Sequence, residues 1–139
     1  MGSRQALMYF DDTVATPSYT INIAPTVLTG YHGESVLEGV IGNTATGVFT
    51  IKVPGVYLAL FNMSFTFSNG QPLEAHFYIN DTVTPYGSHA WGLTSLRSNL
   101  SITAPLSLNK NDRVYVSIIA ESDAQTLTIY DSQFVLVSI

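Results

Sequence analysis

The stretch from Gly47 to Phe67 reads GVFTIKVPGVYLALFNMSFTF and is predicted to form two strands joined by a tight turn. From Val48 to Val53, apolar residues recur at every second position, which is the period of a strand with one largely polar face. Pro54 and Gly55 follow. Proline fixes φ and glycine tolerates unusual backbone angles, so the chain is expected to reverse there.

The segment after this turn, Val56 to Phe67, is apolar on both faces, and only Asn62, Ser64 and Thr66 interrupt the run. Its length would also suit a buried helix, but its β-branched and aromatic content and the Asn69-Gly70 turn signal behind it favour a strand. A strand of an antiparallel sandwich normally faces water on one side, so this strand needs a second buried surface. We interpret that surface as an interface between subunits.

Turn signals recur along the whole chain at the spacing typical of a sandwich or barrel of short strands, and no segment shows a helical stripe. Examples are Pro17-Ser18, Thr29-Gly30, Gly42-Asn43, Pro85-Tyr86-Gly87 and Lys110-Asn111-Asp112. The strands expected between the turns are 6–10, 19–23, 36–41, 48–52, 56–67, 74–80, 98–108, 113–120 and 126–139.

The last predicted strand also carries apolar residues on both faces. Its end, QFVLVSI, places Phe134 and Leu136 on one face and Val135, Val137 and Ile139 on the other. A terminal strand of this kind is expected in the middle of a sheet. For the subunit interface we expect the side chains of Tyr57, Ala59, Phe61, Met63, Tyr115, Val135, Val137 and Ile139.

Composition points independently to an oligomer. The chain has 139 residues, 46% of them hydrophobic and only 11% charged. The usual charged share is about a quarter, so part of the uncharged surface should be covered in the working state. At this length, one domain buries roughly two thirds of its unfolded surface without metals or disulfides.

Charge and residue content exclude several classes of protein. The net charge is −5, and the five basic residues are scattered, so no basic stripe is available to bind nucleic acid. The absence of cysteine excludes disulfides and thiolate chemistry. No apolar run reaches the length of a membrane span, and the first residues lack the pattern of a secretory signal. A membrane partner is therefore not expected.

A series of short motifs follows the chain in a recognisable order. They are Gly47-x-Phe49, Val53-Pro54-Gly55-Val56-Tyr57, Phe77-x-Ile79-Asn80, Ser101 to Leu108, Lys110-Asn111-Asp112-Arg113-Val114 and Ser132-x-Phe134-x-Leu136. This order resembles that of the complement globular-head and tumour necrosis factor jelly-roll superfamily, over about Val40 to Ile139.

The resemblance implies an all-β antiparallel sandwich, a ten-stranded jelly roll that assembles as a homotrimer around a three-fold axis. The expected domain boundaries are 1–23, an N-terminal arm or first strand, and 24–139, a single jelly-roll domain. The chain lacks a collagen-like stalk, cysteine and a signal sequence. In these respects it is more similar to the trimeric jelly rolls that serve as fibre knobs and capsid decoration proteins of bacteriophages than to the secreted animal branch.

The search for catalytic and cofactor motifs is negative, so we expect neither an enzyme nor a cofactor. The three histidines are far apart, and no serine elbow, zinc motif or phosphate loop occurs. A carboxylate pair for glycosidic cleavage, drawn from Glu34, Glu38, Glu74 and the aspartates, is the catalytic alternative. Calcium is the alternative for the aspartates near the strand ends, which are otherwise typical turn residues. These are Asp11-Asp12, Asp112, Glu121-Ser122-Asp123 and Asp131.

Two segments are candidates for binding a partner. The predicted loop from Thr84 to Gly92 contains Tyr86, His89 and the single tryptophan, Trp91, which suits stacking on a sugar or anchoring a protein. The alternative is that Trp91 packs at the end of the sandwich or at the interface.

The second candidate segment contains Met8, Tyr9 and Phe10, in the first 23 residues. This segment is either an arm that docks on a larger assembly or the first jelly-roll strand.

Three functional hypotheses follow. The first is a structural virion protein, a trimeric decoration protein that stabilises a phage head by contacting the major capsid protein. The second is a receptor-binding fibre or tail knob that recognises a host surface glycan or protein. The third is a secreted trimeric ligand domain. The first two place the protein in the virion, on the capsid surface or at a fibre tip.

Overall fold

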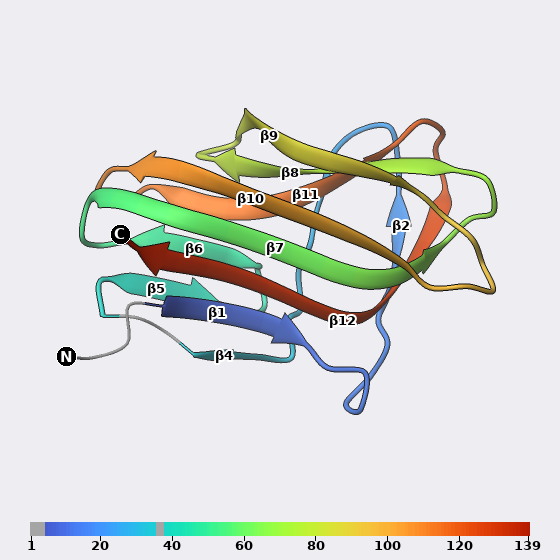
Figure 1. Cartoon of the computed structure of the whole chain (residues 1–139), viewed down its shortest axis with the longest axis horizontal. Helices are drawn as coiled ribbons and strands as arrows, with labels where there is room; N and C mark the ends of the chain where they lie inside the picture. Colours follow the sequence, from blue (N-terminus) through green and yellow to red (C-terminus); the bar gives the residue numbers. More distant parts are fainter. Residues whose placement is uncertain (1–4, 36–37) are drawn as a thin grey trace.

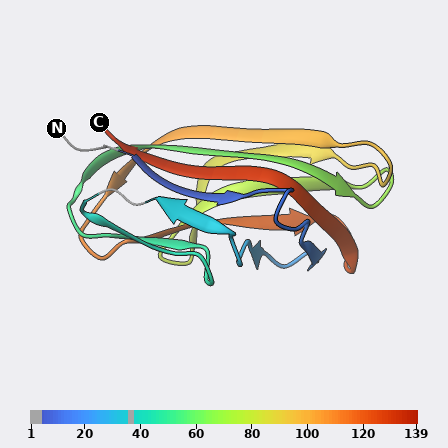
Figure 2. The ribbon, with the colours of Figure 1, turned by 90° about the horizontal axis from the view of Figure 1, so that it is seen from below.

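Across residues 5–35 and 38–139, which the computed structural model describes, twelve strands form two antiparallel sheets stacked as a sandwich (Figures 1 and 2). Five strands in each sheet follow the order of a jelly roll. One short strand is added to each sheet: β2 pairs with β12 in the first, and β3 pairs with β11 in the second. The predicted all-β jelly roll is therefore confirmed. No helix within the described part of the chain is long and apolar enough to cross a membrane.

The sheet that we call sheet A has the order β10-β7-β12-β1-β4, with β2 beside β12. Its strands are β1 (Gln5–Phe10), β2 (Ser18–Ile21), β4 (Gly33–Ser35), β7 (Gly55–Phe67), β10 (Ser98–Leu108) and β12 (Gln125–Ser138). Sheet B has the order β5-β6-β11-β8-β9, with β3 beside β11. Its strands are β3 (Thr26–Val27), β5 (Val40–Asn43), β6 (Val48–Ile51), β8 (Pro72–Ile79), β9 (Thr82–Trp91) and β11 (Arg113–Ala120).

Strand β7 lies between β10 and β12 and pairs with both along nearly its whole length. Its odd-numbered side chains face the core, whereas Leu58 and Leu60 lie on the outer face. The prediction that Tyr57, Ala59, Phe61 and Met63 form the subunit interface is therefore wrong. These four side chains fill the subunit's own core and are 0–3% exposed, so they leave no surface for a partner.

Strand β12 confirms the expectation that the chain ends in the middle of a sheet, since it pairs with β7 on one side and with β1 on the other. A β-bulge between Ile129 and Asp131 adds one residue and shifts the alternation of the strand. Beyond the bulge, Phe134 and Leu136 face the core, and Val135 and Val137 face outward.

Tyr115 was predicted at the same interface, but it lies on β11 in the opposite sheet. Its ring stacks on Tyr78, with centroids 5.5 Å apart, and its hydroxyl donates a 2.6 Å hydrogen bond to Asp81. Arg113 binds the other oxygen of the same carboxylate at 3.0 Å. Tyr115 therefore cannot share a surface with Val135 and Val137, because the outer faces of the two sheets point in opposite directions.

The predicted loop from Thr84 to Gly92 is instead most of β9, the edge strand of sheet B. The hairpin between β8 and β9 turns at Asn80 and Asp81, both with positive φ, as a two-residue turn requires. Pro85 and Tyr86, which were predicted to form a turn, lie at an irregularity in the β8–β9 register. A proline is tolerated there because an edge strand has a free side.

The first strand settles the two alternatives for the N-terminal segment. Strand β1 pairs with β12 and β4, and the side chains of Met8 and Phe10 are buried in the core. Tyr9 faces outward and covers Gly33 of β4. Residues 5–10 are therefore a sheet strand and not a docking arm. Of the strand predicted over 36–41, residues 36 and 37 lie outside the described residues, and the rest contains the start of β5.

The core between the sheets is built around Phe134. Its ring centroid lies 4.8 Å from that of Phe49 and 5.9 Å from that of Phe77, so one side chain of sheet A contacts two strands of sheet B. Tyr31 contacts the same ring at 6.5 Å. Aromatic pairs of this kind add to the free energy gained by burial alone.

Replacing Phe134 with alanine should lower the free energy of unfolding by about 3–5 kcal/mol, because it leaves a cavity where the two sheets meet. The matched control is Gln133→Ala, one position earlier on the outer face, for which a change within about 0.5 kcal/mol is expected. Urea denaturation of both variants measures the difference. Equal effects would contradict the inward orientation of Phe134.

A second prediction concerns Tyr115, whose pKa is raised to about 12 by burial and by its hydrogen bond to Asp81. A raised pKa means that the interaction stabilises the fold fully below pH 10 and is lost as pH rises toward about 12. The Tyr115→Phe variant should therefore be less stable than the wild type at neutral pH, and the difference should shrink over this alkaline window. A pH-independent difference in urea denaturation would contradict the assigned bond.

Candidate binding faces

The outer face of sheet A carries a compact aliphatic patch. Two rows of paired residues cross its central strands: Leu7 lies opposite Val135, which lies opposite Leu60, and in the next row Val137 lies opposite Leu58. We call these five side chains the outer patch. They lie toward the start of β1 and the end of β12, at the left of Figure 1.

The patch continues into a surface with almost no charge. Strands β1, β7 and β10 contain no charged residue, and β12 contains only Asp131. Ile139, beyond the end of β12, is 77% exposed, and Val56 beside it is 46% exposed. Of the predicted interface residues, Val135, Val137 and Ile139 thus lie on or beside the outer patch.

Sequence reasoning missed Leu7, Leu58 and Leu60, although the signal was available. Once Phe134 and Leu136 are assigned to the core, the pairing of β12 with β7 fixes which residues of β7 share their face. Phe61 lies opposite Phe134 and therefore faces inward.

Beyond the patch, the outer face of sheet A is polar and hollowed. A cavity of about 590 Å³ is lined there by Tyr9, Asn62, Gln133, Asp11 and Asp131. Asp11, Asp12 and Asp131 are brought together at its edge, with ligand oxygens within 4.8 Å of one another. Of the predicted calcium candidates these three converge, whereas Asp112 and Asp123 lie elsewhere.

The carboxylates of this acidic group already have partners within the chain. Asp11 accepts hydrogen bonds from the backbone and hydroxyl of Thr13, which lower its pKa. Asp131 accepts a bond from the backbone of Asp12, and the carboxylate of Asp12 lies 3.6 Å from Arg97. This arrangement is that of aspartates stabilising a turn.

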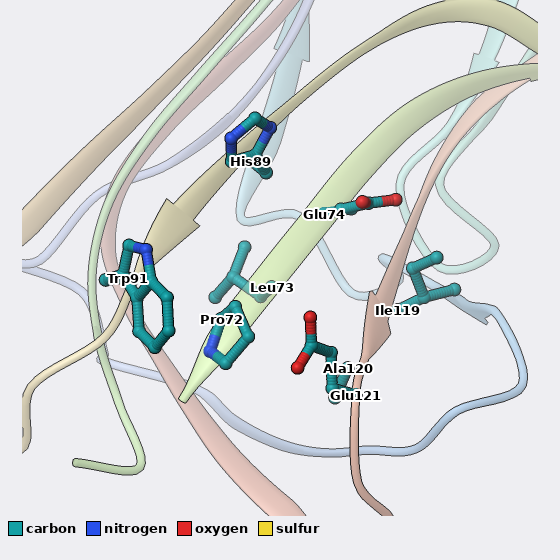
Figure 3. Close-up of a pocket in the computed structure, with 8 residues that line it drawn as sticks. All are labelled: Pro72, Leu73, Glu74, His89, Trp91, Ile119, Ala120 and Glu121. Carbon is teal, nitrogen blue, oxygen red and sulfur yellow. The ribbon is translucent and has the colours of Figure 1, made fainter. Parts of the chain in front are cut away.

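The outer face of sheet B carries a second candidate site, which we call the Trp91 cavity. It measures about 340 Å³ and lies between β8, β9 and the end of β11 (Figure 3). Its lining includes Pro72, Glu74, His89, Trp91, Ile119 and Glu121. Trp91 is 64% exposed, so the alternative that it packs at the end of the sandwich is wrong, whereas its packing at a subunit interface stays a prediction.

The strand register explains how these side chains meet. Trp91 pairs with Pro72, and His89 pairs with Glu74 two positions further along the same face. Ile119 of β11 lies opposite Glu74 on the other side of β8. Tyr86, the third residue predicted for this site, does not line the cavity. It is 39% exposed at the irregular part of β9.

The glycosidase alternative is not supported by the placement of its three glutamates. Glu34 lies on β4 of sheet A, and Glu74 lies on β8 of sheet B, with the core of the sandwich between them. A catalytic pair must flank one bond at a separation of about 5–10 Å. Glu38 precedes β5 and is exposed.

The strand order and the two opposite outer faces define the class of the protein, a jelly-roll sandwich of the tumour necrosis factor and complement type. A family model for the C1q domain matches residues 40–135, which is more than half of the chain. The chain therefore belongs to the C1q domain family, and the predicted resemblance is confirmed. C1q and tumour necrosis factor-like domains are typically binding or ligand domains and not enzymes.

Solved structures share the fold over nearly the whole chain. The globular domain of zebrafish complement 1qA protein is 18% identical, with a TM-score of 0.66, and the match covers 99% of this chain and 98% of that one. Murine APRIL is 10% identical, with a TM-score of 0.61 and coverages of 97% and 99%. Eiger TNF from S. frugiperda is 14% identical, with a TM-score of 0.62 and coverages of 96% and 91%. No curated protein sequence matches the chain.

The exposure of Trp91 has a direct consequence for stability. Trp91→Ala should change the free energy of unfolding by no more than about 0.5 kcal/mol, because the indole contributes little to the core. Phe67→Ala, in the buried end of β7, serves as the control and should cost about 3–5 kcal/mol. Circular dichroism and urea denaturation measure both. Unfolding of the Trp91 variant would show that the indole is structural.

Proposed function

We propose that this chain is a non-enzymatic recognition domain that assembles as a homotrimer through the outer patch and contacts its target with the outer face of sheet B. One observation carries the proposal. The two sheets present opposite kinds of surface: sheet A an aliphatic patch on strands with almost no charge, and sheet B a cavity with an exposed tryptophan. The first suits self-association and the second suits recognition of another molecule.

The energetics favour assembly through sheet A. Burial of apolar surface contributes ~25 cal/mol per Å², and ~4–15 kcal/mol of the total is offset by the freedom lost on association. In a cyclic trimer the interfaces are heterologous, so the outer patch of each copy would lie beside the axis and pack against a different surface of the next copy. The three-fold symmetry itself comes from the resemblance to the superfamily.

We also propose a place for the protein in a bacteriophage virion, on the basis of its cysteine-free sequence. Of the two virion roles, the exposed Trp91 favours a receptor-binding knob at a fibre or tail tip, because a decoration protein has less need of an outward-facing aromatic cavity. The first-named decoration role, in which the trimer would contact the major capsid protein, is the alternative. The secreted ligand domain is the further alternative.

Assembly can be tested with a charge placed in the outer patch. Leu60→Asp should convert the trimer to monomers that remain folded, because three carboxylates would be buried near one another. Ile41→Asp is the matched control, since Ile41 is 53% exposed on β5 of sheet B and should not affect the mass. Light scattering during gel filtration measures the mass, with circular dichroism as the check on folding. A Leu60→Asp variant that keeps the wild-type mass would contradict the proposed interface.

The virion role has an independent test. Mass spectrometry of purified phage particles should detect the chain, and immunogold electron microscopy should place it at fibre or tail tips. Labelling spread over the head would favour the decoration alternative. Absence from particles together with recovery from the culture medium would favour the secreted alternative.

A further inference from the structure

We propose that the Trp91 cavity binds a lysine or arginine side chain of a protein ligand. The proposal rests on the function proposed above, because it names the chemistry of the target that the outer face of sheet B contacts. Three features carry it: an exposed tryptophan, two carboxylates that have no partner within the described chain, and a lining without lysine or arginine.

The geometry places these groups around one opening. Trp91 and Pro72 form one side of the cavity, and Ile119 and Glu121 lie on the opposite side, with the carboxylate of Glu121 directed toward the opening (Figure 3). A side chain that enters between them would contact the indole, apolar carbon and a carboxylate. A lysine or arginine side chain matches these groups, because its alkyl stem can lie along apolar surface while its positive end meets the carboxylate.

The charges around the cavity favour a cation. Across residues 5–35 and 38–139, the side-chain carboxylates of Glu74 and Glu121 take part in no hydrogen bond and no ion pair. Both arginines in this part of the chain are engaged elsewhere, Arg97 with Asp12 and Arg113 with Asp81. His89 is the remaining titratable group in the lining. The cavity of a chain with net charge −5 is thus a local concentration of negative charge.

The size of the cavity favours one side chain over a larger ligand. Its volume of about 340 Å³ lies near the lower limit of small-molecule sites, which span about 300–1,000 Å³. It is also open on the surface of the sheet, so the remainder of a protein ligand could lie across β8 and β9 (Figure 3).

Other ligands fit the same groups less well. A metal ion needs several ligand atoms about 2–2.6 Å from one point. Among the described residues, such convergence occurs at Asp11, Asp12 and Asp131 and not among Glu74, His89 and Glu121. An anion would be repelled by both carboxylates. A sugar could stack on Trp91, but it would gain nothing from the charge, whereas a cation gains from the carboxylates and from the face of the indole.

The test uses the full-length protein and tripeptides of the form acetyl-Gly-X-Gly-amide, where X is arginine, lysine, glutamine or glutamate. The single tryptophan reports binding by its fluorescence and by the NMR shift of its indole N–H. The arginine and lysine peptides should bind saturably, and the glutamine and glutamate peptides should not. Because the attraction is electrostatic, raising the salt from about 0.05 to 0.3 M should weaken binding several-fold.

Substitutions identify the site. Glu74→Gln and Glu121→Gln keep the shape of each side chain and remove its charge, and each should weaken binding of the arginine peptide by about three- to ten-fold. Trp91→Ala should weaken binding of the arginine peptide by about ten-fold. Because this variant has no tryptophan, its binding is measured by the NMR shifts of neighbouring residues. Glu34→Gln on β4 of sheet A is the matched control and should leave binding unchanged.

The results distinguish the proposed cation site from the proposed recognition role of the outer face of sheet B. Equal binding of the arginine and glutamine peptides, or full binding by both glutamate variants, would overturn the cation site. If neutral oligosaccharides shift the indole and the arginine peptide does not, the cation site is overturned and the recognition role of the face stands. If neither perturbs the cavity and the target of the intact protein still binds the Trp91→Ala variant, both proposals fail.

Discussion

The pairing of β7 with β12 in the middle of sheet A is the constraint on which the rest of the structure depends. Because side chains alternate along a strand, this pairing fixes in one step which residues fill the core and which lie outside. Phe61 and Phe134 meet on the inner face, and Leu60 and Val135 meet on the outer one. The core of the sandwich and the outer patch are therefore two consequences of the same register.

Where they cross the outer patch, both strands are apolar on both faces, which is unusual for an antiparallel sheet. The inner face is accounted for by the aromatic cluster around Phe134. Among residues 5–35 and 38–139, no second layer covers the outer face, and the chain has few charged residues to keep such a face soluble. In the proposed trimer, self-association covers this face and leaves sheet B, with the Trp91 cavity, directed outward.

The sequence was sufficient to predict the sandwich and most strand positions, because these depend on local alternation and turn residues. It was not sufficient to predict the phase of β7, since both faces are apolar and only the pairing with β12 distinguishes Phe61 from Leu60. Tyr115 was misplaced for a related reason. The sequence does not tell which sheet contains β11, and its hydrogen bond to Asp81 depends on a hairpin turn at Asn80 that was not identified.

The β9 segment shows another limit. Pro85 and the glycines around it favoured a loop, but an edge strand tolerates proline where a central strand does not. The strand conformation is what brings Trp91 and His89 onto one face, beside Glu74. The residue types alone suggested that this segment binds a partner. The strand register determines which of its side chains line one cavity.

The mass of the unmodified protein in solution tests the central claim most directly. Sedimentation equilibrium at micromolar concentration should give a single species of three times the 15.1 kDa chain mass. A stable species at 15.1 kDa would show that the outer face of sheet A is exposed to water in the working molecule, and the account of the two faces would then be wrong.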